Sequence, residues 1–200
     1  MRSFLICTLV VILTHSIHAQ VVAKGRPGEY QYGSKLKGGY SLLYTTDDSM
    51  QYLYLQKGRK TIAELSSVSN GIQQKSLGYP GADFTSYFLL VHSYGSGNPH
   101  YIELIRKSNG NNIIEDGAAW IGADEKKEHL LYSKQDVPDE KDKMILLNIK
   151  TGKKQEFSFP ADIFDGPGVL SRISIRQLTE KKLVINYDTQ KLSKVKAYNR

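Results

Sequence analysis

Four short apolar runs recur along the chain at nearly even intervals, and they constrain the fold more than any other feature. The runs are SLLY (Ser41–Tyr44), FLLV (Phe88–Val91), HLLY (His129–Tyr132) and LVIN (Leu183–Asn186). The spacings are 46, 41 and 54 residues when counted between Leu43, Leu89, Leu130 and Val184. A period in the forties, with several strands per unit, is typical of a β-propeller blade, which buries its apolar face only against neighbouring blades.

Strand signals dominate the chain beyond its first nineteen residues. Apolar and polar residues alternate in Gln51–Gln56 and in Tyr101–Arg106, as expected for strands with one buried face. Met144–Ile149 is instead a continuous apolar run bounded by turn residues, which is typical of a strand buried on both faces. No window carries a convincing apolar stripe of helical period. The sequence therefore predicts a single antiparallel all-β domain over residues 20–200.

The predicted strands fall into four units, and we expect a propeller-like arrangement with about four blades. The units cover approximately residues 38–68, 77–116, 117–160 and 169–200. The second unit includes predicted strands at Tyr87–Ser93, Tyr101–Lys107 and Asn112–Glu115. The fourth unit lacks an outer strand, which Val21–Ala23 would supply if the two ends of the chain pair to close a ring. The same strands can also form a β-sandwich, which is the alternative fold.

The third unit has a recognisable order of elements. A small-aromatic strand at Ala118–Trp120 is followed by an acidic turn at Asp124–Lys127, an LLY strand, and a TGK hairpin at Thr151–Lys153. Over residues 118–159 this order resembles the blades of TolB-type propellers and of the N-terminal propellers of prolyl-oligopeptidase-type peptidases. The usual SPDGK turn is replaced by GADEK at Gly122–Lys126. The resemblance implies a fold and no particular function.

The first nineteen residues have the order of a secretory signal peptide. Arg2 supplies a positive start, Phe4–Leu13 is apolar, and Ala19 is a small residue suited to cleavage. We expect cleavage between Ala19 and Gln20 and a secreted or periplasmic location. The apolar core of about ten residues is shorter than the roughly twenty that a membrane-spanning helix needs. We therefore expect no transmembrane span in the mature chain.

Charge is distributed unevenly in a chain whose net charge is +7. Residues 20–140 carry 13 basic and 14 acidic side chains, whereas residues 141–200 carry 13 basic and 6 acidic ones. In an exported protein, this basic third predicts an acidic envelope glycan or a protein as the partner. Lysines also keep exposed strand edges from pairing between molecules, which is the alternative explanation. No nucleic-acid recognition motif is present, so nucleic acid is not an expected partner.

The sequence predicts no catalytic residue, no metal site and no cofactor. The single cysteine, Cys7, lies in the predicted signal peptide, so the mature chain lacks a thiol nucleophile. His92 and His100 flank a predicted hairpin and can face each other, but two imidazoles without a third ligand make a weak metal site. Glu115 and Asp116 resemble a glycosidase pair, yet adjacent residues on a strand point to opposite faces.

Tyrosine is the more informative residue type for function. The tyrosines of the first half are Tyr30, Tyr32, Tyr40, Tyr44, Tyr52, Tyr54, Tyr79, Tyr87 and Tyr94. Tyrosine offers a large rigid contact area with a polar tip, which suits recognition of a sugar or a protein. The sequence therefore predicts an exported, non-catalytic binding module. The alternatives are a glycan-acting enzyme or its accessory, and an inhibitor or immunity-type protein.

Overall fold

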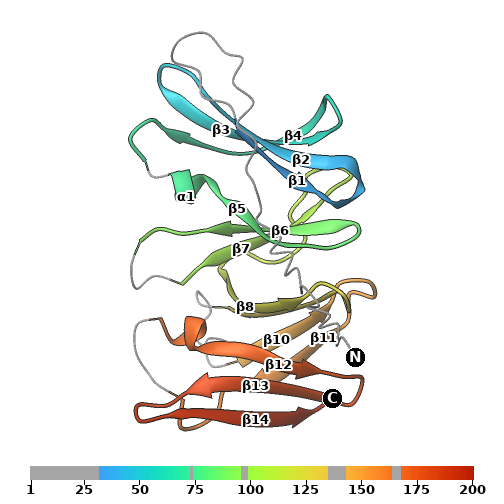
Figure 1. Cartoon of the computed structure of the whole chain (residues 1–200), viewed down its shortest axis with the longest axis vertical. Helices are drawn as coiled ribbons and strands as arrows, with labels where there is room; N and C mark the ends of the chain where they lie inside the picture. The colour runs from blue at the N-terminus through green and yellow to red at the C-terminus, as the bar shows by residue number, and fades with distance from the viewer. Residues whose placement is uncertain (1–31, 73, 96–98, 135–142, 164–167) are drawn as a thin grey trace, which may run out of the picture.

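The computed structural model describes residues 32–72, 74–95, 99–134, 143–163 and 168–200, and these residues form antiparallel β-sheets (Figure 1). The all-β antiparallel prediction is confirmed. The predicted cleavage site at Ala19–Gln20 and the predicted closing strand at Val21–Ala23 lie outside the described residues.

The first sheet has four strands in chain order. Its elements are β1 (Tyr32–Leu36), the 3₁₀ helix η1 (Lys37–Gly39), β2 (Tyr40–Thr46), β3 (Met50–Lys57) and β4 (Lys60–Ser69), followed by α1 (Gln74–Leu77). Leu42 pairs with Leu55 and Tyr44 with Leu53, and all four side chains are buried on one face. The alternation seen in the sequence thus gives this sheet one apolar face toward the rest of the molecule.

The second sheet has seven strands but divides into two groups. Its strands are β5 (Tyr79–Asp83), β6 (Tyr87–His92), β7 (Tyr101–Arg106), β8 (Ala118–Asp124), β9 (His129–Lys134), β10 (Lys143–Asn148) and β11 (Lys154–Ser158). Between β7 and β8 the ladder holds the single register pair Tyr101–Ala119, beside a hydrogen bond from the Trp120 N–H to the His100 carbonyl at 2.8 Å. The groups β5–β7 and β8–β11 therefore follow each other along the long axis (Figure 1).

The third sheet is formed by the end of the chain. It consists of β12 (Ile173–Leu178), β13 (Lys182–Asp188) and β14 (Ser193–Asn199), preceded by the 3₁₀ helix η2 (Val169–Arg172). Figure 1 places this sheet and the first sheet at opposite ends of the molecule. Within the described residues, no strand of the first sheet pairs with a strand of the third.

Three apolar clusters lie between the successive layers, and individual strands contribute to two of them. In β6, Phe88 and Leu90 pack in the cluster shared with the first sheet, whereas Leu89 and Val91 pack in the cluster shared with β8–β10. In β9, Leu130 and Leu131 likewise belong to different clusters. The continuous apolar runs of the sequence are therefore strands buried on both faces.

Two strand predictions need correction in the second unit. The predicted strand Asn112–Glu115 is reduced to an isolated bridge between Asn112 and Ile105. Conversely, β5 was not predicted, because Pro80 and Gly81 interrupt its pattern and produce an irregular register against β6. A Cβ at Gly81 would lie 2.5 Å from Cγ2 of Val91, so glycine permits this close approach.

Helices in the described part of the chain are few and short. None of them combines the length and the apolar character that crossing a membrane requires.

Candidate ligand-binding pocket

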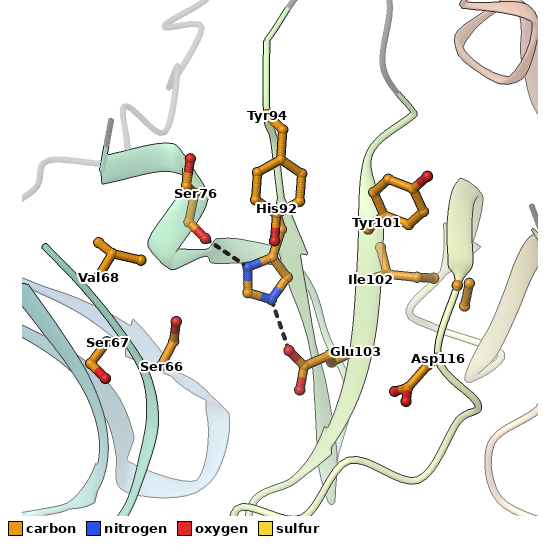
Figure 2. Close-up of a pocket in the computed structure, with 12 residues that line it drawn as sticks. Ser66, Ser67, Val68, Ser76, His92, Tyr94, Tyr101, Ile102, Glu103 and Asp116 are labelled. Atoms are coloured by element: carbon orange, nitrogen blue, oxygen red, sulfur yellow. Dashed lines mark hydrogen bonds and ion pairs between the residues drawn. The ribbon is translucent and has the colours of Figure 1, made fainter. Parts of the chain in front are cut away.

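A pocket of about 450 Å³ lies where β4 of the first sheet meets the β6–β7 hairpin (Figure 2). One wall is formed by residues 66–68 of β4 together with Ser76 of α1. The opposite wall comes from the end of β6 and Tyr94 just after it, from the start of β7, and from residues 116–118, which lead into β8. Segments from three parts of the chain thus converge on one site.

His92 occupies the centre of the pocket and is only 7% exposed. Its Nδ1 lies 3.0 Å from the Ser76 carbonyl oxygen, and its Nε2 lies 2.9 Å from Oε1 of Glu103 (Figure 2). Burial on its own lowers the pKa of His92, but the hydrogen bonds to Glu103 and Ser76 outweigh it and raise the pKa. When protonated, the imidazolium donates to both oxygens and orients the Glu103 carboxylate.

Two tyrosine rings form the rim above His92. The Tyr94 ring stacks on the His92 ring, with centroids 6.4 Å apart and an interplanar angle of 7°. It also lies 6.2 Å from the Tyr101 ring, which is tilted by 56°. Because Tyr94 is 55% exposed, it presents a flat aromatic surface to solvent beside the buried His92.

Two carboxylates line the pocket, Glu103 and Asp116. Of these, only Asp116 was a candidate from the sequence. Glu103 projects from β7 on the His92 side, whereas Asp116 lies on the side of β7 that faces β8 (Figure 2). Glu115, the other member of the considered pair, is bound instead to Nζ of Lys154 at 2.6 Å. The hydrogen bond from Lys154, with burial acting against it, lowers the pKa of Glu115. Glu115 therefore belongs to a surface ion pair.

The two histidines that flank the β6–β7 hairpin, His92 and His100, have different partners. His92 bonds to Ser76 and Glu103, whereas the backbone carbonyl of His100 accepts a hydrogen bond from the Trp120 N–H. No group of three or more His, Cys, Asp or Glu side chains in the described ranges is placed to hold a metal ion.

A buried lysine ties the first sheet to the β5–β7 group at the end of the β6–β7 hairpin away from the pocket. Lys107 is 1% exposed, and its Nζ lies 2.6 Å from Oδ1 of Asp83 at the end of β5. The same ammonium donates to the Phe84 carbonyl at 2.7 Å and to the Lys37 carbonyl at 3.1 Å. Asp83 also accepts the backbone N–H of Lys37 at 2.6 Å. The β1–β2 connection is therefore tied to the β5–β6 turn.

Sequence reasoning missed most of this site for identifiable reasons. Tyr94 was among the tyrosines singled out, but Glu103 and Tyr101 read as ordinary alternating strand residues. Lys107 gave no sign of burial, because a lysine after a strand is normally solvated. Only the long-range packing of β4 and α1 against β6 and β7 distinguishes these residues.

The chain was also compared with known proteins. No family model matches it, and no curated protein matches it.

Proposed function

We propose that this protein is an exported binding module that performs no chemistry, and that the pocket beside His92 is its ligand site. The observation that carries the proposal is the combination of an exposed tyrosine ring with a buried histidine and the half-buried carboxylate that it orients in one cavity. Ligand sites commonly pair aromatic contact area with a few fixed polar groups of this kind. The serine hydroxyls of β4 and α1 add further hydrogen-bonding capacity.

A sugar unit of an envelope glycan fits this combination best. The Tyr94 ring offers a flat surface for the apolar face of a sugar ring, and the Glu103 carboxylate accepts hydrogen bonds from hydroxyl groups. Two carboxylates and one imidazole give the pocket a net negative charge, whether or not the imidazole is protonated. Neutral or amino sugars therefore fit the pocket better than acidic sugars do.

Binding of immobilised glycans by the purified protein tests this proposal. We expect Tyr94→Ala and Glu103→Gln each to weaken binding of the best neutral or amino glycan by at least tenfold. Tyr52→Ala is the matched control, because Tyr52 stacks on Tyr54 at 6.0 Å in the first sheet, outside the pocket. Equal binding by both pocket variants and the control variant would refute the assignment.

A glycan-acting enzyme is the second candidate, because Glu103 and Asp116 line the same pocket. Paired carboxylates are the machinery of most glycoside hydrolases. Their places on two sides of β7, with Glu103 held by His92, favour binding over hydrolysis. Release of reducing sugar that is abolished by both Glu103→Gln and Asp116→Asn would make the protein an enzyme.

Export is part of the proposal and has its own test. The charged start, apolar core and small exit residue of residues 1–19 support cleavage after Ala19. Mass spectrometry of the protein from its native source should find an N-terminus at Gln20 or within a few residues of it. An uncleaved chain as the main species would refute this part.

The finer fold proposal is an open, propeller-like array of four blades. Its support is that β1–β4, β5–β7, β8–β11 and β12–β14 form successive antiparallel layers with an apolar cluster at each junction. Small-angle X-ray scattering distinguishes an elongated array from a compact ring or a two-layer sandwich. A particle with equal long and short dimensions would refute the open array.

A further inference from the structure

The end of the molecule formed by the third sheet is strongly basic. Residues 168–200 carry two acidic side chains, Glu180 and Asp188, and eight basic ones: Arg172, Arg176, Lys181, Lys182, Lys191, Lys194, Lys196 and Arg200. Figure 1 shows β12–β14 as the last layer of the array. Its outer side is therefore not covered by another sheet of the described residues.

The β13–β14 hairpin adds exposed apolar side chains to this charge. Leu192 at the turn is 55% exposed, and Val195 on β14 is 50% exposed. They are two of the five large hydrophobic side chains that are exposed in the described ranges. Lys191 lies next to Leu192 at the turn, and Lys194 and Lys196 follow on β14, on the face of the strand opposite Val195. Basic residues interleaved with exposed apolar ones are typical of surfaces that bind anionic bilayers.

We infer that the β13–β14 hairpin docks on the surface of an anionic phospholipid bilayer, with Leu192 entering the interface and the lysines contacting headgroups. This inference is independent of the glycan pocket, which lies between the first sheet and β6–β7. Charge complementarity supplies the attraction, because each lysine near an anionic surface contributes favourable binding free energy. The exposed leucine distinguishes a lipid partner from a soluble polyanion, which offers no apolar phase.

Backbone polar groups at the hairpin turn have hydrogen-bond partners within the protein. The Thr189 N–H donates to the Leu192 carbonyl at 2.9 Å. Thr189 Oγ1 in turn accepts the N–H groups of Leu192 at 3.1 Å and of Lys191 at 3.3 Å. These polar groups therefore retain partners when water is displaced at a lipid interface, which lowers the cost of dehydration.

The lysines of the hairpin differ in whether their charge is already paired within the protein. Lys194 is bound to Oδ2 of Asp162 at 2.5 Å, which neutralises part of its charge. Lys196 lies over the Tyr198 ring, with its Nζ 6.0 Å from the ring centroid, and stays exposed. Lys191 is exposed at the turn beside Leu192. Lys191 and Lys196 are therefore the lysines to substitute in a test.

Co-sedimentation of the purified protein with lipid vesicles tests the inference. Phosphatidylcholine vesicles containing phosphatidylglycerol should sediment the protein, and pure phosphatidylcholine vesicles should not. Lys191→Gln combined with Lys196→Gln should weaken the partition roughly 25-fold, about fivefold for each lysine. Leu192→Ser should weaken it about tenfold, because its apolar side chain no longer enters the interface.

Matched controls sit at the opposite end of the molecule. Lys35→Gln combined with Lys60→Gln removes two exposed charges from the first sheet, and Ile72→Ser removes a 49% exposed apolar side chain. These variants should partition as the wild type does, and all variants should keep its unfolding temperature. Three outcomes would overturn the inference: no binding to anionic vesicles, equal losses in the control variants, or binding that is insensitive to Leu192→Ser and is matched by heparin.

Discussion

At the scale of single residues, two buried histidines respond to their surroundings in opposite ways. The bonds from His92 to Glu103 and Ser76 raise its pKa against the effect of burial. Burial is the main reason that the pKa of His129 is lowered, and the nearby Arg200 acts in the same direction. His129 donates through Nδ1 to the Lys127 carbonyl and accepts from Arg200 at Nε2, at 2.7 Å and 3.2 Å. One histidine therefore favours the charged form and the other the neutral form.

These directions predict opposite pH dependences of stability. His92 contributes stability that is complete below its ordinary pKa of 6.5 and is lost as the pH rises through its raised folded-state pKa. His129 contributes stability that is present above 6.5 and is lost as the pH falls through its lowered pKa. Urea unfolding should thus show that His92→Gln costs more at pH 5 than at pH 8, and His129→Gln the reverse. Parallel pH profiles would contradict both assignments.

Lys107 is the residue whose loss should damage the fold most. Lys107→Met leaves the Asp83 carboxylate without its ammonium partner, so we expect the free energy of unfolding to fall by about 3–5 kcal/mol. Adding Asp83→Asn should recover part of the loss, because the uncompensated charge disappears. Lys60→Met, at an exposed position of β4, should change stability by less than about 0.5 kcal/mol. A loss that the double variant does not reduce would argue against the ion pair.

At the scale of elements, strands with a clear pattern were predictable and strands held by context were not. The apolar runs at Phe88–Val91 and His129–Tyr132 were predictable as strands, and they lie in β6 and β9. A strand between two layers is apolar on both faces, so its sequence is a continuous apolar run. In contrast, β5 is defined by Pro80 and Gly81, whose presence normally argues against a strand. The pocket was not predictable either, since no local sequence pattern links Ser76 of α1 to His92 of β6.

The last strand is held to its neighbours by its final residues. The Tyr198 hydroxyl donates to the Ser158 carbonyl at 2.9 Å, and burial raises the pKa of Tyr198 to about 12, so it stays protonated. Arg200 donates to the Gln155 side chain at 2.8 Å and to the Thr179 carbonyl at 2.6 Å. These bonds attach the end of β14 to β11 and to the β12–β13 turn.

Arg200→Gln tests how much this attachment stabilises the third sheet. We expect a loss of about 1.5–3 kcal/mol, because hydrogen bonds from a charged donor to partly buried acceptors disappear. Thermal unfolding and limited proteolysis should both detect the change, with earlier cleavage in β14 than in the first sheet. Arg176→Gln, in the exposed part of β12, is the matched control and should have little effect. Equal behaviour of the two variants would contradict the role assigned to Arg200.

At the scale of the whole molecule, the apolar clusters of the described residues join each layer to the layer before it and the layer after it, and the exposed ion pair of Lys37 with Glu125 links the first layer to the β8–β9 turn. Local stability in such linear arrays is greatest where a layer has two neighbours and least at the ends. We therefore predict that amide hydrogen exchange is slowest in β6 and β9 and fastest in β1 and β14. Uniform protection along the array, measured by mass spectrometry, would show that the sheets unfold as one cooperative unit.

Because β6 is buried on both faces, it lacks the usual penalty against a shift of strand register. In a strand with one solvent-exposed face, a register shift of one residue moves its apolar side chains into water. Such a shift is therefore unfavourable. A slip of β6 would only exchange Phe88 and Leu90 with Leu89 and Val91, all of them apolar. Alignment here must depend on side-chain volume: the bulky Phe88 has to meet the first sheet, and the β-branched Val91 has to lie over Gly81, where the missing Cβ leaves room for it. Along Phe88–Val91, shape in place of polarity keeps the strand in register, and the bonds of His92 to Ser76 and Glu103 add a polar constraint at its end.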